Sequence, residues 1–375
     1  MKIVSIVNTN YSLPFDDRVN KECHSLIKQG HKVDIIALEN TNLNSNGITN
    51  YGAHFQILKL LSRKYFSSGK FVPLKLLEWN IRIIRILFFK KWDVLWVNDF
   101  DSILVIIYAK LIKIIHTNRK IVWDHHELFP DRLIKSKIYQ LLLSFCDLII
   151  HANIDRVEYT LSKISNKNQS KYCVLENYPN TAFLEVEVQS LNIDFYNWLN
   201  GSEYCLFQGS ALTYRKVVEC IDAIYQVDNV KLLIMGPCDD KTMNLIQSRW
   251  PSYKDKVFIT GWISQVHFFQ YMDKAIASLV FYENIDTNHW LCAPNRFFNA
   301  ILREIPVISG PNPPMKRIVE GDRIGIICEN NGENVSEISS AINTVKNQNL
   351  EFKSRCHDVK YKYTWESQQQ FFEKI

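Results

Sequence analysis

Four adjacent residues with titratable side chains follow an apolar run in the first half of the chain: Asp124, His125, His126 and Glu127. Carboxyl and imidazole groups can transfer protons or orient a polar substrate near neutral pH. A metal site is the alternative, but successive side chains of a strand point to opposite faces, which makes His125 and His126 poor joint ligands. The zinc pattern HExxH is also absent. We therefore favour a polar active-site loop at the end of a strand.

Two acids, Asp99 and Asp101, occupy a similar position after the apolar run DVLWV. Carboxylates separated by one residue can hold a divalent metal ion. They can also cap the helix that follows, because their oxygens accept hydrogen bonds from the first N–H groups of a helix. We favour the capping role.

In the second half of the chain, Gly209 follows the run YCLFQ, and Arg215 and Lys216 open a helix-like segment. The first N–H groups of a helix and its positive dipole end suit an anion such as a diphosphate. Cations usually favour helix C-termini, so two cations at an N-terminus indicate a bound anion. An arginine can donate two parallel hydrogen bonds to the oxygens of such an anion. The alternative is an ordinary strand–turn–helix unit with exposed basic residues.

A second helix start lies further along the chain, where Pro294 and Asn295 initiate a turn or cap a helix expected from Phe297 to Leu302. The N–H groups of Arg296 and Phe297 would then point at an anion. Simple capping is the alternative, and it is compatible with anion binding.

Short apolar, β-rich runs alternate with helix-period segments along the whole chain, which is typical of parallel sheets covered on both faces. The runs are KIVSIV, KVDIIAL, DVLWVN, KIVWDH, DLIIHA and KYCVLE, then YCLFQG, VKLLIMG, KVFITG, IASLVF, IPVISG and IGIICE. We predict an α/β protein with two Rossmann-like, doubly wound parallel-sheet domains facing across a cleft. Ligands of such sheets bind beyond the carboxyl ends of the strands, and a cleft between domains is the expected site.

Length and composition agree with two globular domains, because 375 residues exceed one ordinary core and 47% of them are hydrophobic against 22% charged. We place the domains at 1–180 and 200–360, joined by an aperiodic stretch. The nine cysteines form no CxxC pair, which favours a reducing cytosol. The first residues are typical of a strand rather than a signal peptide, and no apolar stretch reaches the roughly 18–20 residues of a membrane span.

Charge is unevenly distributed between the halves. Residues 1–180 hold 25 Lys and Arg against 16 Asp and Glu, a difference of +9, and the remainder holds 19 against 23, a difference of −4. Between Lys59 and Lys91, nine basic residues interleave with aromatics against one acid, Glu78. Such a surface suits an anionic membrane, although a solvated basic helix is an equal alternative. No motif supports a nucleic-acid partner.

Six segments, in this order, resemble the GT-B glycosyltransferases and among them the retaining family 4 type: DDRVNKECHSLIKQGHKVDIIAL, VNDFDSILV, WDHHELFPD, FQGSALTYRKVVECIDA, APNRFFNAILREIPVIS and YTWESQQQFFEKI. The resemblance runs nearly from end to end. It weakens the metal interpretation of Asp99 and Asp101. The last segment is similar to the family's closing helix, so residues at about 361–375 are expected to pack back on the first domain.

The resemblance implies that the second domain binds a nucleotide-diphospho-sugar and the first domain the acceptor. His126 would meet the donor sugar, and Arg215 would pair with the phosphates. The implied catalytic residues are His126, Arg215 and Glu127. The implied donor-binding residues are Gly209, Ser210, Arg215, Lys216, Gly261, Trp262, Pro294, Asn295, Arg296 and Asn299. The implied acceptor-side residues are Asp17, Arg18 and Asp124.

This chain departs from the family pattern at two positions. Asn299 stands where the family usually has a Glu that binds the ribose hydroxyls, and Leu291 stands where it has a partner acid. Asparagine can still donate and accept hydrogen bonds, but it lacks the charge that strengthens them. The identity of the donor is therefore left open.

We predict a retaining, metal-independent glycosyltransferase without a cofactor, acting on a glycan or lipid-linked acceptor in bacterial-type surface polysaccharide synthesis (capsule or lipopolysaccharide). It would be cytoplasmic and peripheral on the inner face of the membrane. Two alternatives remain open, a nucleotide-sugar epimerase on the same fold and a non-catalytic partner in a glycan-assembly complex.

Overall fold

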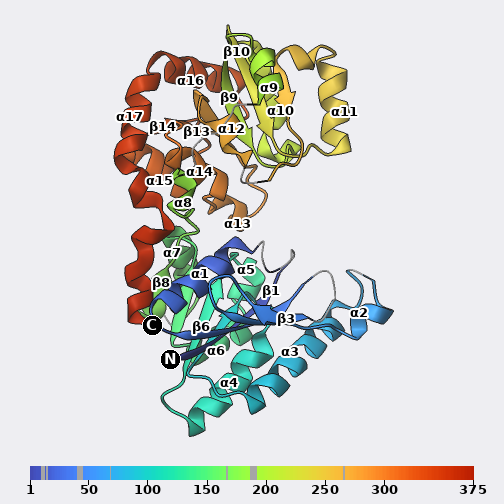
Figure 1. Cartoon of the computed structure of the whole chain (residues 1–375), viewed down its shortest axis with the longest axis vertical. Helices are drawn as coiled ribbons and strands as arrows, with labels where there is room; N and C mark the ends of the chain where they lie inside the picture. The colour runs from blue at the N-terminus through green and yellow to red at the C-terminus, as the bar shows by residue number, and fades with distance from the viewer. Residues whose placement is uncertain are drawn as a thin grey trace. The chain divides into compact units, whose positions relative to one another are not determined.

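The computed structural model describes residues 1–9, 13, 16–39, 45–67, 69–165, 168–185, 192–264 and 267–375. The chain forms two compact units (Figure 1), one of Met1–Glu176 with Gln368–Ile375, the other of Asn177–Ser367. Each unit contains its own parallel sheet. The predicted class, α/β with two Rossmann-like domains, is confirmed.

The sheet of the first unit has the strand order β3-β4-β2-β1-β5-β6-β7-β8. Its strands are β1 (Lys2–Asn8), β2 (Lys32–Leu38), β3 (Ser45–Ile48), β4 (His54–Ile57), β5 (Val94–Asn98), β6 (Lys120–His125), β7 (Leu148–His151) and β8 (Tyr172–Val174). Among the strands described for this sheet, only β3 runs antiparallel to its neighbour. The carboxyl ends of the other strands therefore share one edge, and the register pairs Asn98 with Asp124 there.

The helices of the first unit are α1 (Asp17–Lys28), α2 (Ser62–Tyr65), α3 (Val72–Phe89), α4 (Ile103–Ile115), α5 (Asp131–Ile134), α6 (Lys137–Phe145) and α7 (Ile154–Lys163), with the 3₁₀ turn η2 (Gln169–Lys171). Helix α1 starts where Asp16 accepts a hydrogen bond from the N–H of Val19. Its apolar side, with Val19, Cys23 and Leu26, is buried. Helices α3, α4 and α6 lie side by side on one face of the sheet (Figure 1).

The C-terminal segment consists of two 3₁₀ stretches, η6 (Lys360–Tyr363) and η7 (Trp365–Lys374). The ring of Phe372 stacks on that of Trp96 in β5, with centroids 6.5 Å apart. Gln369 donates a hydrogen bond to Ser25 Oγ on α1 at 3.1 Å. The last eight residues thus complete the core of the first unit.

The sheet of the second unit has the order β11-β10-β9-β12-β13-β14, and its paired strands are all parallel. The strands are β9 (Glu203–Gln208), β10 (Val230–Met235), β11 (Val257–Ile259), β12 (Ala277–Val280), β13 (Val307–Ser309) and β14 (Gly325–Ile327). Because all six run the same way, the loops that follow them gather at one edge.

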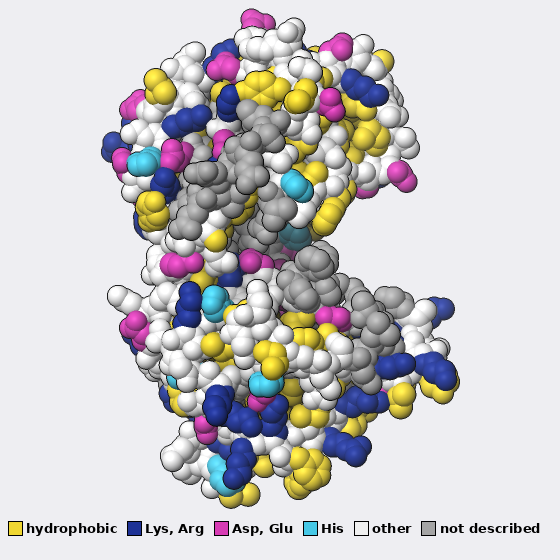
Figure 2. All heavy atoms as spheres, viewed as in Figure 1, with side chains coloured by type: hydrophobic (Ala, Val, Ile, Leu, Met, Phe, Trp, Pro, Cys, Tyr) yellow, Lys and Arg dark blue, Asp and Glu magenta, His cyan; other side chains and the backbone are white. Residues whose placement is uncertain are grey.

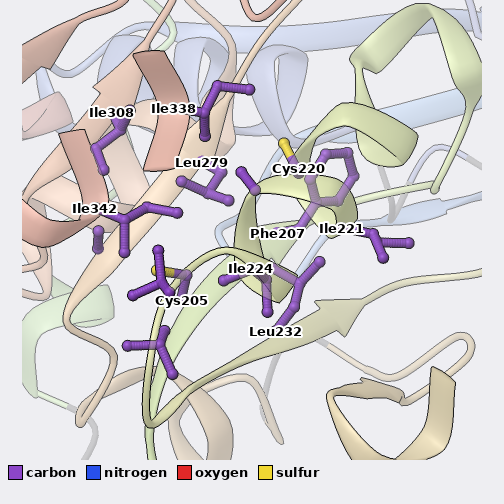
Figure 3. Packing of buried hydrophobic residues seen from close by; sticks show 14 of the residues in the cluster. Cys205, Phe207, Cys220, Ile221, Ile224, Leu232, Leu279, Ile308, Ile338 and Ile342 are labelled. Atoms are coloured by element: carbon purple, nitrogen blue, oxygen red, sulfur yellow. The ribbon is translucent and has the colours of Figure 1, made fainter. Parts of the chain in front are cut away.

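The helices of the second unit are α8 (Ala182–Glu185), α9 (Ile193–Leu199), α10 (Val217–Tyr225), α11 (Asp240–Arg249), α12 (Phe269–Met272), α13 (Thr287–Trp290), α14 (Asn295–Leu302), α15 (Pro313–Asp322), α16 (Val335–Asn347) and α17 (Asn349–Val359), with 3₁₀ turns η3 (Thr213–Arg215) and η4 (Tyr253–Asp255). Figure 3 shows the core between this sheet and helices α10 and α16, where Phe207, Ile224, Leu279 and Ile342 are fully buried. This packing fixes the start of α10 against the end of β9.

The described helices include none that combines the length and apolar character needed to cross a bilayer. All nine cysteines carry free thiols.

Candidate functional site

At the carboxyl edge of the first unit, the ends of β5 and β6 bring two acids and a histidine together. Asp99 follows β5 in a left-handed conformation, with φ 55°. This turn directs its carboxylate to the N–H of His126, which donates to Asp99 Oδ1 at 3.1 Å. The predicted capping role of Asp99 and Asp101 is wrong. The first N–H groups of α4 donate instead to Asn80 Oδ1, and Asp101 accepts from the side chain of Asn8.

A buried ion-pair network lies behind this edge. The Arg18 guanidinium contacts both oxygens of Asp124, at 2.9 and 3.1 Å, and Glu22 Oε1 at 2.9 Å. Asp124 is fully buried, and Arg18 and Glu22 nearly so. Burial would raise the pKa of Asp124, but the charges of Arg18 and His126 outweigh it and lower the pKa well below its usual range. Arg18 and Asp124, which the sequence places on the acceptor side, are both buried, and Asp124 contacts His126; their acceptor-side role stays a prediction.

The His126 side chain is held between two carboxylates, with Nε2 3.4 Å from Asp124 and Nδ1 3.6 Å from Asp99. Burial by itself would lower the pKa of His126, but Asp99 and Asp124 outweigh it and raise the pKa to about 10. His126 is therefore an imidazolium at neutral pH. In this form it supplies positive charge and N–H donors rather than a nucleophile or a general base.

We expect His126 to stabilise the fold in a pH-dependent way. Its folded pKa of about 10 lies above the unfolded value of ~6.5, so its contribution to the free energy of unfolding is complete below pH ~6.5 and is lost as the pH rises through about 10. Denaturant unfolding of wild type and His126→Gln between about pH 6 and 10 should show a difference that shrinks with pH. A His126 imidazole that titrates near pH ~6.5 by NMR would contradict this.

The neighbours of His126 point elsewhere. His125 is buried on the other side of the strand, where its ring contacts those of Trp123, Phe129 and His151. Burial lowers the pKa of His125 well below its usual range, so it is neutral. The Glu127 side chain is 67% exposed, with its carboxylate 3.5 Å from the buried Arg156.

Asp17 is the first residue of α1, with its carboxylate exposed and 2.7 Å from the ammonium group of Lys21. It lies at the solvent-facing start of the helix whose next residue, Arg18, is buried. Of the three predicted acceptor-side residues, Asp17 alone is open to solvent.

Glu22, Asp124 and His126 offer ligand atoms that all lie within 4.8 Å of one another, which is compatible with a metal ion. However, the guanidinium of Arg18 already contacts both carboxylates, and burial raises the pKa of Glu22 well above its usual range, which favours its uncharged form. A divalent ion among these ligands would have to displace that cation. The donor set therefore fits a metal poorly.

In the second unit, Gly209 and Gly236 end the adjacent strands β9 and β10 in close contact. A Cβ on Gly236 would lie 2.4 Å from the carbonyl oxygen of Gly209, and Gly236 has φ +155°. Gly209 has φ +99°, and a Cβ there would lie 3.0 Å from a guanidinium nitrogen of Arg215. Both positions therefore require glycine, and Gly209 lies where the sequence predicts a diphosphate cradle with Ser210.

Replacement of Gly236 by alanine should lower the free energy of unfolding by about 1–3 kcal/mol, because backbone strain is added to the overlap with Gly209. Denaturant unfolding measures this loss. The matched control is Gly261→Ala, where φ is also positive at +69° but a Cβ meets nothing within 4 Å. Equal losses in both variants would show that overlap with Gly209 contributes nothing.

Two arginines converge on one aromatic ring at this edge. The Arg215 guanidinium lies 5.6 Å from the ring centroid of Tyr282, and that of Arg296 lies 4.8 Å from it. Arg215 also donates to the carbonyl of Ser210 at 3.2 Å. Arg296 is buried and donates to the carbonyls of Gln208 and Phe281. Burial, and then repulsion from Arg215, lower the pKa of Arg296.

The start of α10 matches the predicted anion site in part. Lys216 is its N-cap, in a left-handed conformation with φ 59°. The first helical bond runs from the N–H of Cys220 to the carbonyl of Lys216, so the N–H groups of residues 217–219 precede it. The Lys216 side chain is largely buried, with Nζ 3.5 Å from Glu333 on the loop before α16.

The start of α14 differs from the prediction in its hydrogen bonding. Pro294 is the N-cap, and the N–H of Phe297 donates to the carbonyl of Pro294 at 2.9 Å. That N–H is therefore not directed at an anion, contrary to the prediction. The Asn295 side chain accepts from Asn177 at 3.0 Å. The helix packs Phe297, Phe298 and Ile301 into the core of the unit, and it carries the buried Arg296.

The remaining predicted donor-binding residues lie on α14 and in the loop after β11. Asn299 is 4% exposed and Leu291 6% exposed, so both are buried. Gly261 follows β11 with φ +69°, and the next residue, Trp262, is 78% exposed. A flat apolar side chain this exposed can stack on a nucleobase.

Sequence reasoning missed Glu22 and Tyr282. Glu22 lies four residues after Arg18, a spacing that brings two side chains together on a helix and could have indicated the ion pair. Tyr282 follows the run IASLVF, and its contact with two arginines from other segments has no signal in the sequence.

The two-unit fold is that of the GT-B glycosyltransferases, as solved structures of this fold show. The E. coli trehalose-6-phosphate structure with bound UDP-2-fluoro glucose is similar with a TM-score of 0.75 and 10% identity, covering 100% of this chain and 98% of its own.

Two further structures are similar over 100% of this chain and 98% of their own. Anabaena HepE in complex with UDP and glucose has a TM-score of 0.72 and 11% identity. Sucrose-phosphate synthase from Thermosynechococcus elongatus has a TM-score of 0.72 and 14% identity. No protein-family profile and no curated protein sequence matches the chain. The predicted GT-B fold is therefore confirmed, and the family 4 assignment stays a prediction.

Proposed function

We propose that this protein is a glycosyltransferase that takes a sugar from a nucleotide-diphospho-sugar. The observation that carries the proposal is the arrangement of Arg215 beside Gly209 at the start of α10. A guanidinium there, with the dipole end of the helix, suits the two phosphates of a leaving nucleoside diphosphate. Trp262 is proposed to contact the base, and Asn299 the ribose.

The charges fit the needs of the reaction. Loss of a nucleoside diphosphate builds negative charge on the leaving oxygen, and preorganised cations stabilise it. We propose that the sugar is transferred with retention. The acceptor hydroxyl would attack from the face that the diphosphate leaves, and a departing phosphate oxygen would take its proton. His126 is proposed to position the donor sugar through its N–H groups, and Glu127 to accept hydrogen bonds from hydroxyls.

The reaction is proposed to need no metal, because Arg215 and Arg296, with the start of α10, supply positive charge at the edge that would bind the diphosphate. Turnover should be unchanged by a chelator. Loss of turnover with EDTA that Mg²⁺ or Mn²⁺ restores would overturn this part of the proposal.

We propose that the acceptor is a glycan or a lipid-linked carrier in surface polysaccharide synthesis, and that the enzyme works at the inner face of a membrane. The basic character of the first half of the chain supports this. Equal turnover of a short soluble acceptor and of its lipid-linked form would count against it.

The test of the proposed function is a thermal-shift screen against UDP-, GDP-, CMP- and ADP-sugars without metal. UDP-sugars come first, because similar structures hold UDP or UDP-glucose. A ligand at 100 times its Kd adds ~2.7 kcal/mol of stability to the unit that binds it. One clear hit, followed by acceptor-dependent release of the nucleotide, supports the proposal. No hit with any nucleotide overturns it.

The replacement of the family's Glu by Asn299 favours one other candidate, a non-catalytic partner in a glycan-assembly complex. Such a protein would bind nucleotides weakly. If Asn299→Glu creates a thermal shift that wild type lacks, the non-catalytic candidate gains support.

A further inference from the structure

The outer faces of three helices in the first unit are apolar where helices of this kind usually carry polar side chains. On α3, Leu74, Leu77, Ile81 and Phe88 follow one another at helical spacing and are 46, 45, 55 and 69% exposed. The opposite face of α3 is buried against the unit, through Trp79 and other residues. This helix is therefore apolar on the side that packs and on the side that faces solvent.

Helices α4 and α6 repeat the pattern. On α4, Ile107, Leu111, Ile114 and Ile115 are 38, 58, 68 and 75% exposed. On α6, Ile138 and Leu141 are 62 and 54% exposed. Helix α4 contacts both α3 and α6, and the three helices lie side by side (Figure 1). We call the exposed apolar side chains of α3, α4 and α6 together the three-helix face. Single exposed apolar residues are ordinary, but a continuous surface of this kind marks an interaction site.

Basic side chains outnumber acidic ones on the three-helix face, where Lys113 is paired with Asp147 from the segment after α6. Its helices carry Lys75, Arg82, Arg85, Lys110, Lys113 and Lys137, against one acid, Glu78. Glu78 is already bound, to Arg82 at 2.8 Å and to the N–H groups of Leu61 and Ser62. Figure 2 shows apolar and basic side chains interleaved over the part of the surface where α3 and α4 lie. The face is thus apolar and cationic together.

The stripe of α3 continues into a groove. A cavity of about 830 Å³ lies between α3, α2 and β4 and shares Leu74, Leu77 and Ile81 with the stripe. Its other lining includes Leu58, Arg85 and the paired Glu78 and Arg82. The volume is that of a site for a small molecule, and the apolar wall with a cation suits a chain that ends in an anionic headgroup.

We propose that the three-helix face binds the surface of an anionic phospholipid bilayer, with its apolar side chains inserted among the lipids and its cations at the headgroups. Amphipathic helices bind membranes in this way, and basic residues near the surface add attraction to anionic lipids. A second copy of the chain is a poorer occupant. A symmetric dimer through this face would press the same cations against one another. This inference rests on the proposed function, because it names the membrane as a partner of that enzyme. Binding to vesicles can nevertheless be measured without a nucleotide-sugar donor.

The test is sedimentation of the full chain with vesicles, either phosphatidylcholine with phosphatidylglycerol or phosphatidylcholine alone. We expect binding to the anionic vesicles alone. Ile114→Glu/Ile115→Glu should lower the partition coefficient at least ~10-fold, since two inserted side chains are lost. Lys110→Glu should weaken binding and reduce its dependence on salt. The control is Leu350→Glu, which changes an 86% exposed side chain on α17 of the other unit and should leave binding intact.

Equal binding to neutral vesicles, or unchanged binding of the Ile114→Glu/Ile115→Glu variant, would overturn the proposal. So would a dimer in solution that this variant dissociates. Thermal unfolding of the variant without ligand, compared with wild type, shows whether the first unit is folded, because the substituted side chains are exposed. Failure of the proposed function alone would give vesicle binding without any nucleotide shift.

Discussion

Replacement of Arg215 by alanine is expected to lower kcat/KM by about 10²–10³-fold, the usual effect of removing one preorganised group that stabilises transition-state charge. Arg215 is the predicted phosphate partner, and its guanidinium is held ready by Tyr282 and by the carbonyl of Ser210. Little reorganisation is therefore needed when the leaving group becomes charged. The measurement is initial-rate kinetics with the sugar nucleotide found in the thermal-shift screen, together with the shift itself, which the substitution should abolish.

Two further variants show whether the loss of kcat/KM in Arg215→Ala comes from the lost charge or from a general effect on the unit. Arg215→Lys should recover part of the loss, because lysine keeps the charge but cannot grip two oxygens or stack on a ring in the same way. Arg249→Ala removes another arginine of the same unit, half-exposed and paired with Asp222, and should leave kcat/KM unchanged. If Arg215→Ala retains wild-type turnover and donor binding, the donor site lies elsewhere.

Replacement of Asp124 by alanine is expected to lower the free energy of unfolding of the first unit by about 3–5 kcal/mol. The reason is the charge left behind, since the buried Arg18 would keep its contact with Glu22 while losing both oxygens of Asp124. His126 would lose one of its two carboxylates as well. Denaturant unfolding followed by fluorescence measures the loss, and comparison with the second unit's transition shows whether it is local.

The control for this prediction is Glu158→Ala, which removes an exposed acid of the same unit and should change stability by less than ~0.5 kcal/mol. The pH dependence gives a second check. Because the folded pKa of Asp124 is lowered, its stabilising contribution is present above the unfolded value of ~3.9 and is lost in acid. Wild type and Asp124→Ala should therefore converge in stability as the pH falls. A constant difference down to acid pH would contradict the charged state of Asp124.

The alternation of apolar runs and amphipathic segments determined the fold class, because a parallel sheet needs continuous apolar strands and a helix between each pair of them. It also determined which residues reach the functional edge. Each of the residues Asp99, His126, Gly209 and Arg215 follows a predicted strand. The loops after parallel strands lie at one edge of the sheet because of the strand direction, independently of their side chains. The apolar and basic character of residues 59–91 was likewise visible in the sequence.

The tertiary structure alone decided how these side chains are used. Asp99 accepts a hydrogen bond from the N–H of His126 rather than capping α4, because its φ of 55° points the carboxylate away from that helix. Asn80 on α3 accepts from the first N–H groups of α4 instead. Arg18 and Asp124, 106 residues apart, are joined only when the fold brings the start of α1 to the end of β6.

The same holds in the second unit, where Tyr282 brings Arg215 and Arg296 around one ring. Spacing along the chain fixes local geometry. Which residues are buried or ion-paired depends on which segments fold against one another. The same is true of the exposure of the outer faces of α3, α4 and α6. These contacts cannot be deduced from a single sequence.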